Sequence, residues 1–226
     1  MAAQGSDVLF NSSFERSEKI KLSICAAKYI FVRKGQSDVI LLSEGYISFV
    51  SSQGFFAALG HNECNTSTPY TNAELYAQDK ISDEPIQAGR VLLSHPTGVY
   101  GAFYDDYKPP VFSQMAVAAP SELSIGAPAE LWMSVGAGEP QVFKGRIVAL
   151  FPGKPHPVLF EVTDNRFPGA SFGSSGSVVV QSGKIAAVVA GANKNPARLL
   201  YCTAAEQMLI DLKDMIRKLA ASEDIC

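Results

Sequence analysis

Short apolar or alternating runs, separated by polar turns, dominate the pattern of hydrophobic and polar positions along this chain. Such runs, bounded by Gly, Pro, Asn, Asp and Ser, are typical of β-strands. In the first half we expect strands at residues 20–24, 29–32, 39–42, 46–50, 54–59, 90–94 and 98–103. In the second half we expect them at residues 113–118, 129–135, 142–150, 157–163, 177–181 and 184–190. Most of the chain is therefore predicted to form β-sheet.

Two polar segments interrupt this pattern. Residues 62–85 are rich in Asn, Thr, Ser and Asp, which predicts a long surface loop. Residues 105–110 end in two consecutive prolines, which exclude a helix and a central strand at that point. We therefore expect a boundary between two β-rich halves, residues 1–108 and residues 109–226.

The hydrophobic period changes near the C-terminus. Apolar residues there recur at helical spacing, at Leu209, Leu212, Ile216 and Leu219. This spacing predicts a helix over residues 203–221. Thr203, followed three residues later by Glu206, has the pattern of a capping box at its start. Two runs of strands closed by one helix predict an all-β protein of two barrels with a C-terminal α-helix.

Composition limits the functions that this fold can carry. The chain has 226 residues, of which 47% are hydrophobic and 18% are charged, so it can bury a substantial core. The net charge is −3 and no Lys/Arg cluster occurs, which argues against nucleic acid as a partner. No apolar run is long enough to span a membrane, and residues 1–30 lack the pattern of a signal peptide. These features favour a cytoplasmic protein.

The cysteines give no metal-binding pattern. The four thiols, Cys25, Cys64, Cys202 and Cys226, are scattered and form no Cys-x-x-Cys pair. A zinc site needs paired ligands at short spacing, so we expect neither a metal nor another cofactor. Without a secretory signal, we expect the thiols to be reduced.

Residues 172–180, Phe-Gly-Ser-Ser-Gly-Ser-Val-Val-Val, are the most informative stretch for chemistry. A serine hydroxyl becomes a nucleophile when a base takes its proton and donors hold the developing oxyanion. Glycines permit a tight turn in which the amides of Gly173 and Ser175 can point at one place. Ser175 is thus a candidate nucleophile, although a Gly/Ser-rich loop before a buried strand would have the same pattern. A strand pattern follows, where a lipase or esterase of the α/β-hydrolase type would begin a helix.

His61 is the candidate general base. It follows the apolar strand expected at residues 54–59 and opens a polar loop, so a rigid element would hold its ring at the mouth of a site. His95, before a proline, and His156, between two prolines, are the competing histidines. A base in the first half and a nucleophile in the second match chemistry in a cleft between two barrels. We therefore predict a chymotrypsin-like double β-barrel.

The residues alone leave the acid of a triad open. Asp164 ends an alternating stretch eleven residues before Ser175, and Asp105 and Asp106 follow His61 by 44 and 45 residues. An acid here must be desolvated and bonded to the imidazole. Each of the three could instead be a turn aspartate that bonds its own backbone.

Several ordered segments of this chain resemble the stage IV sporulation protein B peptidase family. They are Phe56–His61 (FAALGH), Val162–Arg166 (VTDNR), Gly173–Ser177 (GSSGS), Gln181–Lys184 (QSGK), Gly98–Gly101 (GVYG) and Ala116–Leu131. The resemblance covers roughly residues 45–210. Ser174 replaces the family's Met, Val178 replaces its Pro, and residues 190–192 replace a Thr-His pair. The spacing from Asp164 to Ser175 is also shorter than in that family.

The resemblance implies a trypsin-like serine endopeptidase with His61, Asp164 and Ser175 as its triad. The family's role implies a regulatory protease that cuts itself and a protein partner, so polypeptide is the expected substrate. We expect the strand at residues 188–192, with Ala190 and Gly191, to form one wall of the substrate cleft. Gly169, six residues before the nucleophile, indicates no strong preference for a basic side chain. The alternatives are an inactive member of the same fold that acts as a binding module, and a structural β-protein.

Overall fold

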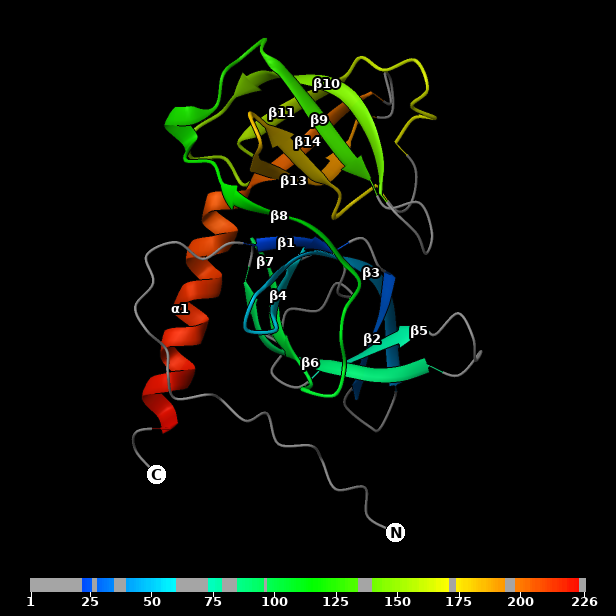
Figure 1. Ribbon diagram of the computed structural model, residues 1–226, viewed down its shortest axis with the longest axis vertical. Helices are drawn as coiled ribbons and strands as arrows, with labels where there is room; N and C mark the ends of the chain where they lie inside the picture. The colour runs from blue at the N-terminus through cyan, green and yellow to red at the C-terminus, as the bar shows by residue number, and fades with distance from the viewer. Residues whose placement is uncertain are drawn as a thin grey trace.

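The architecture is known from a computed structural model of the chain. The structure describes residues 22–25, 28–34, 40–59, 73–78, 85–95, 97–133, 140–170, 174–193 and 198–223. Within these residues the chain folds into two β-barrels and one long helix (Figure 1).

The N-terminal barrel is a closed ring of antiparallel strands. Its strands are β2 (Lys28–Lys34), β3 (Ile40–Ser51), β4 (Phe55–Ala58), β5 (Glu74–Gln78), β6 (Pro85–His95) and β7 (Gly98–Phe103). They pair in the order β3-β2-β5-β6-β7-β4, and β4 returns to β3 to close the ring. Closure removes the exposed edges that an open sheet would leave. Its interior holds large apolar side chains that include Tyr29, Phe31, Ile47, Phe56 and Phe103.

The C-terminal barrel repeats this closed arrangement. Its strands are β9 (Pro128–Met133), β10 (Gln141–Leu150), β11 (Val158–Val162), β12 (Val178–Gln181), β13 (Lys184–Ala192) and β14 (Leu199–Ala204). They pair in the order β12-β9-β10-β11-β14-β13, and β12 pairs with β13 to close the ring. Alternating burial along β9 and β11 shows why period-2 patterning identified these strands from the sequence.

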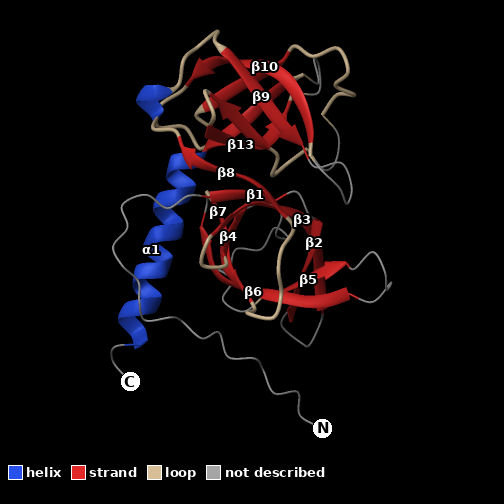
Figure 2. Cartoon of the chain, viewed as in Figure 1, coloured by secondary structure: helices blue, strands red, loops and turns tan. Residues whose placement is uncertain are grey.

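Two strands and the helix join the barrels. β8 (Val111–Val117) pairs with β13 in parallel and with β1 (Leu22–Cys25), which in turn pairs with β3. A short 3₁₀ turn, η3 (Pro120–Glu122), follows β8. The helix α1 (Ala205–Glu223) leaves the C-terminal barrel and runs along the outside of the N-terminal one (Figure 2). A third core, which includes Phe49, Tyr100, Val188, Met208 and Leu212, fills the space where both barrels and α1 meet.

The structure confirms the prediction of an all-β protein with two barrels and a C-terminal helix, and it corrects several local expectations. The segment expected to be one long loop, residues 62–85, contains strand β5. Residues 40–51, where the sequence predicted parts of two separate strands, form the single long strand β3. Thr203 lies in β14 and is buried, so it does not cap the helix, which begins at Ala205. The capping-box pattern was therefore misleading, because β14 runs directly into α1.

Candidate active site

Ser175 lies in a tight turn that leads into β12. The amide of Ser177 donates to the carbonyl of Ser174 at 3.2 Å, which closes the turn. The amide of Gly176 donates to the carbonyl of Val189 at 2.9 Å, and the Val189 amide donates to the Ser177 carbonyl at 2.8 Å. These bonds attach both sides of the turn to β13. Ser174, Gly176 and Ser177 are buried, whereas Ser175 is half-buried.

Gly176 explains why a Gly-Ser sequence occurs at this turn. Its φ of +88° is a left-handed conformation that residues with a Cβ adopt only with strain. A Cβ at this position would lie 3.1 Å from Cβ of Tyr46 and 3.2 Å from the Tyr46 carbonyl oxygen. Two separate constraints, backbone conformation and close approach, therefore require glycine beside the candidate nucleophile.

This contact joins the two barrels at the turn that carries Ser175. Tyr46 and Ser48 belong to β3 of the N-terminal barrel, and Ser48 Oγ would lie 3.7 Å from a Cβ at Gly176. Ile47, between them, is the register partner of Ala58, the last residue of β4. The end of β4 therefore lies beside the stretch of β3 that contacts the Ser175–Gly176 turn.

Two of the predicted site residues lie outside the described residues. His61 follows β4 within the undescribed segment 60–72, and Gly173 belongs to the undescribed segment 171–173. The roles of His61 as base and of the Gly173 amide as an oxyanion donor therefore stay predictions. The same holds for the role of Ser175, whose placement alone is described.

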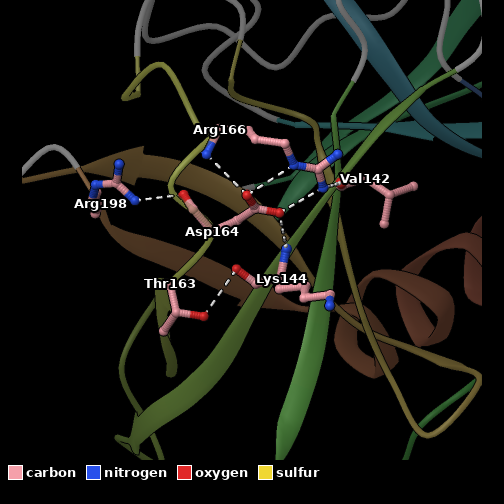
Figure 3. A network of polar contacts seen from close by, with 6 residues as sticks. All are labelled: Val142, Lys144, Thr163, Asp164, Arg166 and Arg198. Atoms are coloured by element: carbon pink, nitrogen blue, oxygen red, sulfur yellow. Dashed lines mark hydrogen bonds and ion pairs between the residues drawn. The ribbon is translucent and has the colours of Figure 1, made fainter.

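Asp164 lies just after β11, and its carboxylate binds the residues around it (Figure 3). Oδ1 accepts from the Arg166 amide at 3.0 Å and from Arg166 Nε at 3.1 Å. Oδ2 accepts from Arg166 Nη2 at 2.7 Å and from the Lys144 amide at 3.3 Å. Arg198 donates to the Asp164 backbone carbonyl at 2.7 Å. A carboxylate offers about four acceptor positions, so these bonds occupy the side chain fully.

The Arg166 bonds hold the pKa of Asp164 well below its ordinary value, first through the guanidinium and then through the backbone amide. Only 8% of the Asp164 side chain is exposed, whereas 73% of the Arg166 side chain is exposed. Asp164 is thus ionised, and its exposed partner Arg166 screens it from water. The bond from the Arg166 amide to Asp164 is the backbone-bonding turn that the sequence left as an alternative for this residue.

Asp105 and Asp106 lie far from the end of β4 that precedes the undescribed segment 60–72. They form an exposed turn after β7, whose residues pair in antiparallel register with β4. Ala58, three residues before His61, lies opposite Val99 near the start of β7. Counting residues along the two strands, the turn lies roughly 20 Å from Ala58 at about 3.3 Å per residue. This spacing argues against the pair 105–106 as partners of a side chain near Ala58, and Asp164 as the acid stays a prediction.

A buried acid that the sequence patterns did not single out lies on α1. Asp211, with 11% of its side chain exposed, accepts from the Tyr100 hydroxyl at 3.2 Å and from Gln207 Nε2 at 3.0 Å. Thr97 Oγ1 also donates to Asp211, and His95 Nδ1 lies 3.4 Å from its carboxylate. The available signal was a charged residue inside the apolar stripe formed by Met208, Leu212, Met215 and Ile216.

The two competing histidines are both exposed, and the predicted cleft wall is half-buried. His95 is exposed at the end of β6, turned toward Thr97, and His156 is exposed between β10 and β11, 3.1 Å from the Thr203 hydroxyl. Ala190 and Gly191 are half-buried near the end of β13. A Cβ placed at Gly191 would have no atom of the described residues within 4 Å, so these residues leave open space beside the strand there.

Two of the four cysteines lie within the described ranges. Cys25 and Cys202 are buried, and burial raises the pKa of the Cys202 thiol. Cys64 and Cys226 lie outside those ranges. In the part of the chain that the structure describes, no three His, Cys, Asp or Glu side chains gather in a way that could hold a metal ion. Over the same part, no helix is long and apolar enough to cross a membrane.

Comparison with known proteins identifies relatives by structure alone. No family model matches the chain, and no curated protein matches it. The Rv3671c protease from M. tuberculosis in its active form superposes with a TM-score of 0.51 at 18% identity, over 92% of this chain and 94% of that chain. The HtrA-type protease AlgW with tripeptide gives 0.56 at 13% identity, over 86% of this chain and 61% of that chain.

A serine endoprotease from Yersinia pestis gives a TM-score of 0.51 at 15% identity, over 86% of this chain and 64% of that chain. This chain therefore spans less than two thirds of the latter two proteins. At such identities the likeness establishes the fold, which is the chymotrypsin-like double β-barrel predicted above. The neighbours are HtrA-type and trypsin-like serine proteases, and no match is specific to the stage IV sporulation protein B family.

Proposed function

We propose that this chain is a serine endopeptidase with Ser175 as nucleophile and His61 as general base. The main observation in support of this proposal is that the Ser175–Gly176 turn contacts Tyr46 and Ser48 of the other barrel. Ala58 at the end of β4 pairs with Ile47, between those two residues. His61 follows Ala58 by three residues, a span of at most about 11 Å of extended chain. This topology supports the proposal, because the segment that carries His61 begins beside the stretch of β3 that contacts the Ser175–Gly176 turn.

The chemistry follows from these roles. His61 takes the proton of the Ser175 hydroxyl as Oγ attacks the carbonyl carbon of a peptide bond. The amides of Gly173 and Ser175 donate to the oxyanion of the tetrahedral intermediate, at roughly 3 kcal/mol of barrier for each donor. His61 then protonates the leaving amine as the C–N bond breaks. Water, deprotonated by His61, hydrolyses the ester and restores the Ser175 hydroxyl.

Asp164 is proposed as the acid that orients His61, on the resemblance described above. In the structure all its acceptor positions are occupied, by Arg166 and the Lys144 amide. An imidazole N–H therefore replaces one Arg166 bond when the triad assembles. The exposed guanidinium is the partner most easily displaced, because water can solvate it after it leaves.

We propose an extended polypeptide as substrate, paired as an added strand along the end of β13. On the side of β13 that pairs with β12, the backbone groups of Val189 are hydrogen-bonded to Gly176 and Ser177 of the Ser175 turn. Ala190 and Gly191 come next along β13, and the space beside Gly191 is open. Backbone pairing with an exposed strand gives affinity that depends little on the substrate's side chains.

The direct test is labelling with a fluorophosphonate probe, which reacts with activated serine hydroxyls. Wild-type protein is expected to incorporate one probe, located by mass spectrometry on Ser175 and not on the neighbouring Ser174 or Ser177. Ser175→Ala and His61→Ala should both abolish labelling while circular dichroism shows the same β-rich fold. Equal labelling of wild type and Ser175→Ala would refute the nucleophile.

Self-processing is a separate part of the proposal and rests on the family resemblance. It is tested by mass spectrometry of purified protein after incubation, comparing wild type with Ser175→Ala. Cleavage products confined to the wild type, and unchanged in proportion on dilution, would indicate cutting within one molecule. The sequence at the cut would also report the specificity.

An inactive chymotrypsin-like fold that serves as a binding module is the second candidate. The observation in its favour is the saturation of Asp164 by Arg166 and Lys144, which leaves no acceptor for an imidazole in the described state. Under this alternative, extended peptides bind along β13 without being cleaved, and the probe labels neither wild type nor Ser175→Ala.

A further inference from the structure

Ser48 carries a buried hydroxyl that has no hydrogen-bond partner among the described residues. The residue is 0% exposed, and its Oγ is one of two buried side-chain polar atoms in the described part of the chain that lack a partner. A buried hydroxyl without a partner loses its bonds to water and gains nothing in return. Such groups are rare in folded proteins, and each calls for an explanation.

The backbone at Ser48 is irregular in a way that aims this side chain. Ile47 pairs with Ala58 and Phe49 pairs with Ala57, so Ser48 is the extra residue of a β-bulge in β3. A bulge interrupts the alternation of side chains between the two faces of a sheet, and it commonly redirects a side chain next to a functional site. In a regular strand, the side chains of Ile47 and Phe49 would point to the same face of the sheet and that of Ser48 to the opposite face.

The redirected hydroxyl lies against the nucleophile turn. A Cβ at Gly176 would be 3.7 Å from Ser48 Oγ, so the hydroxyl lies beside the Gly176 backbone. The amides of Gly176 and Ser177 already donate to Val189 and Ser174. With these two amides engaged, and the Ser175 amide directed at the oxyanion in the proposed function, the partner left for Ser48 on this turn is a carbonyl oxygen, that of Ser175 or of Gly176, to which the hydroxyl would donate.

We propose that Ser48 is a positioning residue of the candidate active site, which rests on the proposed peptidase function. Its hydroxyl has no partner among the described residues of the resting protein and donates to a carbonyl of the Ser175–Gly176 turn when that turn adjusts during acylation. The bond then fixes the peptide that carries Ser175 and leaves the Ser175 amide directed at the oxyanion. Keeping the hydroxyl lowers the stability of the resting state in exchange for reactivity, a trade found at other functional sites.

The test compares the rate constant of fluorophosphonate labelling with the urea midpoint of unfolding. Ser48→Ala is expected to slow labelling about tenfold, the effect of one neutral hydrogen bond. Its urea midpoint should equal or exceed that of wild type, because no resting bond is lost. Ser48→Cys keeps a γ atom at this position, slightly larger than oxygen, but donates weakly, so it should slow labelling to a similar degree.

Ser51 on the same strand provides a matched control. It is also buried, but its hydroxyl accepts from the amide of Phe55 at 3.2 Å and of Gln53 at 3.4 Å. Ser51→Ala should therefore lower the urea midpoint and leave the labelling rate of the folded protein unchanged. Slower labelling of Ser51→Ala together with a lower urea midpoint for Ser48→Ala would contradict the role proposed for Ser48.

The remaining outcomes separate the two proposals. If wild type is labelled and Ser48→Ala reacts at the same rate, the role of Ser48 is refuted and the peptidase function stands. A lower midpoint for Ser48→Ala, or a wild-type rate for Ser48→Cys, would show a resting bond or a packing role and also refute it. If wild type is not labelled at all, the peptidase proposal fails, and the role of Ser48 in acylation fails with it.

Discussion

The hydroxyl of Tyr100 donates to Oδ2 of Asp211 at 3.2 Å, which connects strand β7 to the C-terminal helix in the core between the barrels. Burial is the main cause of the raised pKa of Tyr100, so the phenol stays protonated and donates. Thr97 and Gln207 also donate to this carboxylate. One acidic residue thus fixes α1 to the N-terminal barrel through its bonds from Tyr100 and Thr97, and Gln207 holds its carboxylate from within the helix.

Replacement of Asp211 should therefore be costly. We expect Asp211→Ala to lower the free energy of unfolding by about 2–4 kcal/mol, because the donors of Tyr100 and Thr97 lose a charged partner. Asp214→Ala on the same helix is the control, since that residue and its partner Arg217 are both largely exposed. It should change stability by less than about 0.5 kcal/mol. Urea unfolding followed by fluorescence measures both variants, and equal effects would contradict this view of Asp211.

The ion pair of Asp164 and Arg166 predicts a pH dependence of stability. Because the pKa of Asp164 is lower in the folded state, its contribution is complete above the unfolded value of about 3.9 and is lost as the pH falls through the folded value. The stability difference between wild type and Asp164→Asn should thus be constant from about pH 7 to pH 5. It should shrink below about pH 4. A difference that grows on acidification would have the wrong sign and refute the assignment.

Separate replacement of Asp164 and Arg166 should distinguish a triad acid from a loop anchor. If Asp164 orients His61, Asp164→Ala should lower kcat by roughly 10³-fold or more. Arg166→Ala should keep or raise the activity, because it frees acceptor positions on the carboxylate. If Asp164 only anchors its loop, both variants should lose stability and neither should lose more than a few-fold in kcat. Peptide hydrolysis, corrected for folded fraction, gives the answer.

The Gly176 position should tolerate no side chain. Gly176→Ala combines a strained φ of +88° with a Cβ only 3.1 Å from Tyr46, so we expect a loss of about 2–4 kcal/mol and of fluorophosphonate labelling. Gly183→Ala is the matched control, since Gly183 also has a positive φ, of +72°, but a Cβ there would have no atom of the described part of the chain within 4 Å. It should cost about 1 kcal/mol and leave labelling intact. Equal losses would show that the contact with β3 contributes nothing.

Local pattern was sufficient for most of the strands and for the helix. Alternation along β9 and β11 and the apolar stripe from Met208 to Ile216 are properties of neighbouring residues, because one face of each element is buried. The double barrel followed from the number and order of these elements. The Gly-Ser stretch around Ser175 likewise indicated a tight turn, because only glycine readily adopts the backbone that Gly176 has.

Tertiary structure alone decided which distant residues meet. The closed register of β3 with β4 produces the bulge at Ser48 and places it against Gly176, which no local pattern encodes. Strand β5 is held by pairing with β2 and β6 inside a segment whose composition favours a loop. Asp211 receives its hydrogen bonds from Tyr100 and Thr97 only because α1 packs against β7 and the residue that precedes it. Hydrophobic period specifies which face of an element is buried, but pairing register and barrel closure specify the partner, because they depend on contacts far apart along the chain.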